Sequence, residues 1–362
     1  MNMMFELLCH SLRLKDEPWT EKSVNWEAVF REAQKQTVVG VAFDGMQEVV
    51  ERGCSAIERP LLLQWYSEVM AIERQNAAVN QRMKEVAVML QRAEIPFVVM
   101  KGQAMAARYP NPMHRQSGDV DVFVWNGMYR QACELLVQNG GVADEVAPEK
   151  HAEFMYHGVV VEVHHTLLDV CSPAAMKYLK GLDYNSLVET RQVAGMDVPC
   201  FKDAFNSVYM LGHMVHHLLT EGLGLRQVCD WMVLMAQMQP YIYNNVEELK
   251  RHLDGMQMRE AFSAFAMLGV KHFGLDAACW QWALLKNAER TADTLMAFVL
   301  ESGNFGRKTN EKKSSKTLQG NFSNAKLYFR HLIRLRHIAP AEVRWFFFTR
   351  IKRWWKKRKT QG

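Results

Sequence analysis

The stretch MKGQAMAARYPNPMHRQSGDVDVFV, residues 100–124, carries the pattern from which the fold is predicted. The stretch begins at the end of an apolar run and continues from Gly102 with a short helical pattern. It ends in a strand-like run whose first polar residues are Asp119 and Asp121. Residues two apart on a strand point to the same face, so the two carboxylates are expected side by side. Two negative charges this close repel unless a cation neutralises them. The pair therefore predicts a metal site.

A third carboxylate follows in VVVEVHH, residues 159–165. Glu162 is expected on the same strand face as His164, while the flanking valines face the other way. Carboxylate oxygen is the ligand that Mg²⁺ prefers, and Mg²⁺ is usually held by one or two carboxylates together with substrate phosphates. We expect Asp119, Asp121 and Glu162 to hold metal, with Glu162 or His164 accepting a proton during the reaction.

Positive groups flank the carboxylates. Gly102, where a strand turns into a helix, is expected to expose backbone N–H groups to an anion such as phosphate, with Lys101 beside it. Arg115 offers a fixed positive charge for a triphosphate. Each feature alone has a structural explanation: a turn for Lys-Gly, a solvated strand end for the aspartates, a core position for the histidine. Their order along the chain favours a nucleotide site.

Periodicity divides the rest of the chain. Residues 1–92 repeat apolar positions at three and four residues, which predicts an N-terminal helical region. Residues 93–202 alternate strand-like and helical pieces and form the predicted core; the strand-like pieces are residues 96–101, 119–125, 153–158, 159–165 and 195–201. Residues 203–301 return to helical periodicity. The Gly-, Ser- and Lys-rich residues 302–324 indicate a linker before a basic aromatic tail, residues 325–362. The expected fold class is α+β, a small mixed sheet flanked by helices, with helical regions on both sides in sequence.

Composition limits the class of protein. The chain has 362 residues, 49% hydrophobic and 23% charged, which is ordinary for a globular protein of two or three packed units. Its seven cysteines never form a C-x-x-C pair, so neither a disulfide framework nor a zinc ribbon is predicted. No window approaches the roughly 18 apolar residues of a membrane span, and the N-terminus lacks the cleavage site of a secretion signal. We expect a cytoplasmic protein.

The net charge of +5 is concentrated at the C-terminal end, where residues 307–362 hold 17 Lys and Arg against two acidic residues. Within it, residues 344–359 contain eight basic residues interleaved with tryptophan and phenylalanine. This composition favours an anionic membrane surface, reached at the inner face of the membrane. A solvated tail is the second interpretation, and nucleic acid, bound through phosphates and base stacking, the third.

The segment HMVHHLLTEGLGLRQVCD, residues 213–230, places three histidines on one helix face, His213 and His217 among them. A zinc site there lacks the glutamate of H-E-x-x-H and a third ligand, so histidines packed inside the helical region or facing substrate are favoured. Arg226 and Asp230 are four apart and are expected to share a helix face. They are either a surface ion pair or an arginine, oriented by Asp230, that reaches the triphosphate.

The pattern K-G-x-x-x-A-x-x-Y-P-x-P-x-x-R-x-x-G-D-x-D at residues 101–121 resembles the signature of the bacterial uncharacterised nucleotidyltransferase family, within the DNA polymerase beta-like nucleotidyltransferase superfamily. The E-x-H that begins at Glu162 and the H-x-x-x-H…R-x-x-x-D segment of residues 213–230 resemble its later motifs. The resemblance covers residues 60–300. The superfamily's usual Gly-Ser is replaced by Lys-Gly here, followed by Gln103, so the hydroxyl that cradles phosphate is absent.

The resemblance implies a small sheet flanked by helices and transfer of NMP from ATP or another NTP to a hydroxyl, with release of pyrophosphate. It implies two Mg²⁺ ions, with Mn²⁺ as the alternative ion, on Asp119, Asp121 and Glu162. It also implies nucleotide-binding roles for seven further residues: Lys101, Gly102, Arg115, His213, His217, Arg226 and Asp230. The alternative is a non-catalytic nucleotide-binding or membrane-surface module on the same fold. The sequence leaves open the NTP, the oligomeric state, and whether the acceptor is a small molecule, a glycan intermediate or a protein.

Overall fold

The computed structural model describes residues 3–15, 19, 23–143, 151–302, 332–346 and 348–349. The chain divides into two compact units. The first consists of Met1–Leu167, Asp183–Asn206 and Cys229–Gln237. The second consists of Leu168–Leu182, Ser207–Val228 and Met238–Gly362. The domain boundaries expected from the sequence stay a prediction.

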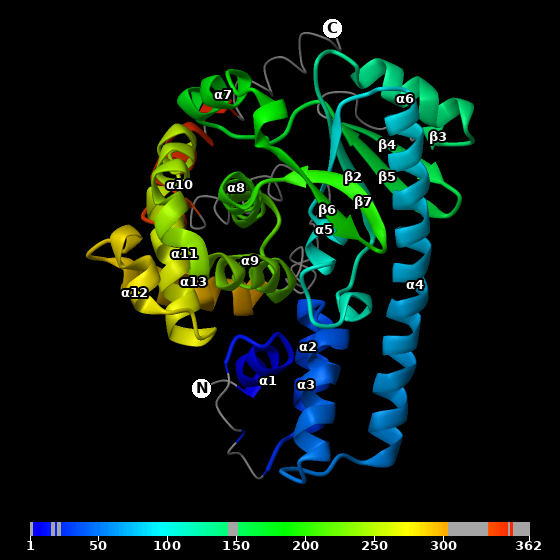
Figure 1. Cartoon of the computed structure of the whole chain (residues 1–362). Coiled ribbons are helices and arrows are strands. Elements are labelled where there is room, and N and C mark those ends of the chain that lie inside the picture. The colour runs from blue at the N-terminus through cyan, green and yellow to red at the C-terminus, as the bar shows by residue number, and fades with distance from the viewer. Residues whose placement is uncertain are drawn as a thin grey trace, which may run out of the picture. The chain divides into compact units, whose positions relative to one another are not determined.

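Four helices open the first unit, as the periodicity of residues 1–92 predicts: α1 (Met3–Ser11), α2 (Trp26–Gln36), α3 (Val39–Glu51) and α4 (Arg59–Arg92). The side chain of Asn25 accepts a bond from Ala28 N and so caps the start of α2. Trp65 of α4 is fully buried among these helices, where its Nε1 donates to Val39 O at 3.0 Å. With 34 residues, α4 is about 50 Å long, so its later turns reach the sheet (Figure 1).

The first unit contains a five-stranded sheet in the order β1-β2-β5-β4-β3 (Figure 1). Its strands are β1 (Phe97–Met100), β2 (Asp119–Val124), β3 (Val142–Ala143), β4 (His151–Tyr156) and β5 (Val159–His164). The β2 and β5 strands pair in parallel and the other neighbours pair antiparallel, so the sheet is mixed. Together with the helices on both sides in sequence, this confirms the expected α+β class.

One face of this sheet is apolar and forms the core of the first unit. Val122 of β2 is in register with Val163 of β5, and both are buried. They belong to a cluster with Val86 and Leu90 of α4 and Leu136 of α6 (Tyr129–Gln138). Because strand side chains alternate between faces, burying every second residue leaves the residues between them for the opposite face.

A second, two-stranded sheet pairs β6 (Val188–Val193) with β7 (Met196–Phe201). The turn consists of Ala194 and Gly195, both at positive φ (51° and 78°), as a two-residue hairpin requires. The sequence predicted β7 but not β6, whose VETRQV alternates mostly polar residues. Between β1 and β2 lie the short helix α5 (Gly102–Ala106) and a 3₁₀ turn, Pro112–His114.

The second unit is helical in its described part, as expected for the C-terminal region. It holds most of α8 (Asp203–Thr220), the start of α9 (Leu225–Met238), and the helices α7 (Pro173–Lys180), α10 (Ile242–Met256), α11 (Arg259–His272), α12 (Ala277–Trp280) and α13 (Ala288–Ser302). Phe262, Phe265 and Trp280 are fully buried in its core. Residues 332–335 and 340–346 are also helical, and Glu342 accepts bonds from the backbone N–H groups of Cys171 (2.6 Å) and Ser172 (3.1 Å).

The expected linker, beyond Ser302, lies outside the described residues. So does most of the basic segment 344–359, of which only residues 344–346 and 348–349 are described. Among the helices of the described ranges, none has the length and apolar character needed to cross a bilayer.

Candidate functional site

The face of the large sheet opposite its apolar core carries carboxylates and imidazoles. The parallel register places Asp121 beside Glu162, and the antiparallel register places His151 of β4 beside His164 of β5. Asp119, two residues before Asp121, shares its face. The structure therefore brings together the four residues that were predicted as catalytic, from two strands that are neighbours in space but about 40 positions apart in sequence.

Asp121 is buried at the centre of this group, with 3% of its surface exposed. Its Oδ1 lies 2.8 Å from Lys101 Nζ and 2.9 Å from His164 Nε2. Burial alone would raise the pKa of Asp121, but the positive charges of Lys101 and His164 outweigh it and hold this pKa well below its usual range. The carboxylate is thus kept ionised inside the protein.

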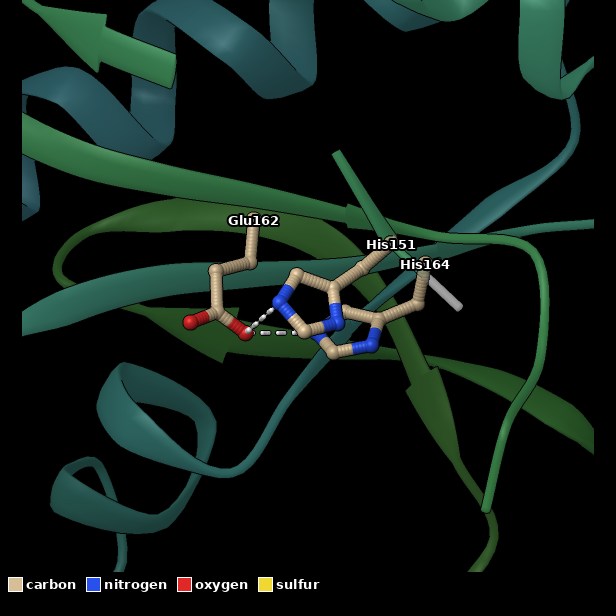
Figure 2. Close-up of side chains that lie close together, drawn as sticks. All are labelled: His151, Glu162 and His164. Carbon is tan, nitrogen blue, oxygen red and sulfur yellow. Dashed lines mark ion pairs between the residues drawn. The ribbon is translucent and has the colours of Figure 1, made fainter. Parts of the chain in front are cut away.

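Glu162 and two histidines, His151 and His164, lie close together (Figure 2). Glu162 Oε2 is 3.0 Å from His164 Nε2 and 3.9 Å from His151 Nε2. Burial by itself lowers the pKa of His164, while its hydrogen bonds to Asp121 and Glu162 raise it, and the net shift is upward. The two neighbouring carboxylates therefore outweigh burial in their effect on the pKa of His164.

The connection that leads from β1 into α5 has an unusual backbone. Lys101 has φ 48° and ψ −132°, and Gly102 follows with φ 22°. A positive φ costs a lysine about 1–3 kcal/mol, whereas a glycine adopts it without strain. This turn directs the Lys101 ammonium group toward Asp121, since the two atoms form the ion pair described above.

Arg115, expected to meet a triphosphate, is buried in a network of the first unit. Its Nε and Nη2 donate to the two oxygens of Asp230, each at 2.7 Å, and its Nη1 donates to Ser117 Oγ at 2.7 Å. Tyr109 also donates to Asp230 Oδ1, at 2.7 Å. Burial, and after it the charge of Asp230, raise the pKa of Tyr109 well above its usual value. The phosphate-binding roles of Arg115 and Asp230 stay predictions.

The remaining predicted residues lie in the helices. His213 and His217 are one turn apart in α8, and their Nε2 atoms are 3.0 Å apart. Arg226 is in α9, one turn before Asp230, as the spacing predicts. The side chain with which Asp230 forms its bidentate pair is nevertheless Arg115, which is 115 positions away. The nucleotide-binding roles of His213, His217 and Arg226 stay predictions.

The sequence pattern did not predict His151. Its strand was expected to begin at Glu153, but β4 begins at His151 and pairs that residue with His164. The available signal was the alternation H-A-E-F-M-Y, which puts His151 and Glu153 on one face and Phe154 on the other. Alternation within one strand does not determine the register between β4 and β5, and it is this register that brings His151 close to Glu162.

The donor set fits a divalent cation. The Nε2 atom of His164 can carry one proton, yet it lies within bonding distance of one oxygen from Asp121 and one from Glu162. Acceptor atoms therefore outnumber the protons available at this point. Oxygen ligands from Asp119, Asp121 and Glu162 are those expected for Mg²⁺ or Mn²⁺.

Comparison with known proteins places this geometry in context. A family model described as uncharacterised nucleotidyltransferase matches residues 22–274. No curated protein is significantly similar in sequence. Among solved structures, the chain is similar to the antibiotic-resistance factor ANT(2'')-Ia at 11% identity and a TM-score of 0.37, over 50% of this chain and 94% of that one. A nucleotidyltransferase-like antigen from Paracoccidioides brasiliensis gives 15% identity and a TM-score of 0.33, over 57% and 96% of the two chains.

Proposed function

The chain belongs to the uncharacterised nucleotidyltransferase family, and from this premise we propose that it transfers NMP from an NTP to a hydroxyl of an acceptor. In the reaction a bond forms between the acceptor oxygen and the α-phosphorus. The bond from the α-phosphorus to the β-phosphate oxygen breaks, and pyrophosphate leaves. The acceptor proton passes to Glu162 or to His164. Family membership supports the class of reaction, and the acidic sheet face supports its location.

Asp119, Asp121 and Glu162 are the residues that would hold two divalent ions in this proposal. Bound Mg²⁺ or Mn²⁺ supplies Lewis-acid polarisation of the α-phosphate and charge neutralisation for the leaving pyrophosphate. The protein contributes position: β2 and β5 are rigid, paired in parallel, and packed on an apolar core, so the carboxylates are held in a fixed arrangement. Lys101, at the edge of the same group, is proposed to contact phosphate oxygens.

One observation carries the proposal: a buried, ionised aspartate shares its neighbours with a second carboxylate on the same sheet face. One imidazole nitrogen carries at most one proton. Here Asp121 and Glu162 share His164, and Asp121 draws on Lys101 as well. Strongly perturbed groups in such clusters are typical of functional sites.

The experiment is nucleotide binding in the presence of Mg²⁺, measured by equilibrium dialysis with each labelled NTP for the full chain and for Asp119→Asn. Asp119 lies at the start of β2 and is only partly buried, so its substitution tests the metal site with less risk to folding than that of Asp121. We expect affinity for Mg²⁺–NTP to fall at least tenfold, about 1.4 kcal/mol. Asp197→Asn, an exposed aspartate in β7, is the matched control.

If the parent, Asp119→Asn and Asp197→Asn bind Mg²⁺–NTP equally well, the acidic sheet face is not the nucleotide site. Binding without pyrophosphate release in any acceptor mixture would favour the alternative, a non-catalytic nucleotide-binding module. Attachment of residues 344–359 to an anionic membrane is a separate proposal that is supported by their composition alone.

A further inference from the structure

His151 belongs to the acidic sheet face but has no part in the proposed reaction. It is half-buried at the start of β4, and its imidazole ring lies 4.9 Å from that of His164, centroid to centroid. Its Nε2 is 3.9 Å from Glu162 Oε2, which is too long for a hydrogen bond. Hydrogen bonding therefore does not explain why this nitrogen faces the carboxylate.

The three side chains His151, Glu162 and His164 offer ligand atoms that all lie within 4.8 Å of one another. Two ligands bound at about 2.1 Å and at right angles around one ion are about 3.0 Å apart, and opposite ligands are about 4.2 Å apart. The Glu162–His164 separation of 3.0 Å and the Glu162–His151 separation of 3.9 Å both fall in that range. Two of the three separations thus already match those around one ion, and all three side chains come together on the sheet face (Figure 2).

Ligand chemistry separates this group from an all-oxygen site. Two imidazole nitrogens and one carboxylate oxygen suit transition ions such as Zn²⁺ and Co²⁺, whereas Mg²⁺ is held by oxygen ligands and water. The donor set resembles the open sites of two histidines and a carboxylate more than it resembles a site for Mg²⁺ alone.

We propose that His151, Glu162 and His164 form a mixed nitrogen and oxygen site that binds a divalent transition ion of the Zn²⁺ and Co²⁺ class more tightly than Mg²⁺, without nucleotide. The inference rests on the proposed function only in taking Glu162 and its neighbouring carboxylates as metal ligands. It adds His151 to that set of ligands. Glu162 Oε1 points away from both imidazoles and remains available to the acceptor proton (Figure 2).

The test is a titration of the full-length protein with Co²⁺ in the absence of nucleotide, followed by visible ligand-field absorption. We expect saturable binding that Zn²⁺ reverses at equal concentration and that Mg²⁺ reverses only at an excess of tenfold or more. His151→Gln, which removes one partly exposed ligand, should weaken Co²⁺ binding at least tenfold.

Two control variants separate this site from other histidines. His157→Gln alters the exposed turn between β4 and β5, and His213→Gln alters the histidine pair of α8. Both should keep the parent affinity. Loss of the Co²⁺ signal in His213→Gln, parent-like binding in His151→Gln, or equal affinity for Mg²⁺ and Co²⁺ would each overturn the inference.

Nucleotide binding distinguishes the two proposals. Mg²⁺–NTP binding to the parent, measured separately by equilibrium dialysis, is required by the proposed function and not by the transition-ion site. If Mg²⁺–NTP does not bind while Co²⁺ still binds, the proposed function is refuted and the transition-ion site is kept. If Mg²⁺–NTP binds while Co²⁺ does not, only the transition-ion site is refuted.

Discussion

The substitution Asp230→Asn should lower the free energy of unfolding of the first unit, because it removes the charge that neutralises the buried Arg115. Asp230 and Arg115 are 3% and 5% exposed, and two bonds of 2.7 Å join them. Asparagine keeps the shape of aspartate but offers one neutral oxygen where two charged ones stood. Arg115 would remain charged, since a guanidinium does not lose its proton in a protein.

The magnitude follows from burial. Removing one partner of a buried, hydrogen-bonded pair typically costs about 3–5 kcal/mol, because the other charge stays buried without compensation. Tyr109 and Ser117 still contact the network, and the remaining amide oxygen of Asn can accept one bond, so we expect the lower end, about 3 kcal/mol. The number is the cost of leaving Arg115 unpaired and not the net contribution of the pair to stability.

Equilibrium urea unfolding followed by tryptophan fluorescence measures this cost; Trp231, next to Asp230 in sequence and fully buried, is one of the residues that contribute to the signal. For a slope of about 3 kcal/mol per molar, the midpoint should fall by about 1 M. The matched control is Glu134→Gln, which breaks an Arg–carboxylate pair whose side chains are 90% and 58% exposed, and which should change stability by less than about 0.5 kcal/mol. If both variants unfold at the same urea concentration, the buried pair does not stabilise the unit as argued.

Two further predictions concern basic side chains that pair with carboxylates, His114 and Lys101. Burial lowers the pKa of His114, but its contacts with Asp44 (2.6 Å) and Glu73 (3.0 Å) raise it above the ordinary value. This stabilisation is complete below about pH 6.5 and is lost as pH rises through the folded-state pKa, so the free energy of unfolding should fall as pH rises above about 6.5, and should fall less in His114→Gln than in the parent when both are unfolded in urea over a pH series. Lys101→Met should tighten nucleotide-free Mn²⁺ binding by about tenfold, or 1.4 kcal/mol, because Lys101 Nζ competes for Asp121 Oδ1; an unchanged Mn²⁺ affinity by calorimetry would show that the ammonium group does not compete.

The acidic sheet face was predictable because it depends on alternation. Asp119, Asp121, Glu162 and His164 were all found by asking which residues share a strand face, and in the structure His164 contacts both Asp121 and Glu162. Alternation of valine with polar residues over a short segment is the pattern that indicates a half-buried strand.

Register and long-range pairing were not predictable in the same way. The partner of Asp230 depends on how a helix and a loop 115 positions apart are folded together, whereas the sequence offers only the neighbour at four residues, Arg226. The strand β6 was missed because its exposed face is polar and its buried residues are few. His151 became visible only through the pairing of β4 with β5.

Asp121 and Asp230 are both buried in the first unit, but their partners indicate different roles, a functional site for Asp121 and structural support for Asp230. Asp230 pairs with a planar guanidinium that matches both of its oxygens and accepts a third bond from a phenol, so nothing in the geometry calls for another cation. Asp121 meets the Lys101 ammonium, a compact charge on a flexible stem, and an imidazole shared with Glu162. A lysine can leave a carboxylate by rotating its side chain, whereas a buried bidentate arginine cannot leave without exposing two charges. Lys101 and His164, which a metal ion could displace, therefore lie at the proposed metal site around Asp121. Arg115, which cannot be displaced in this way, pairs with Asp230 and stabilises the fold.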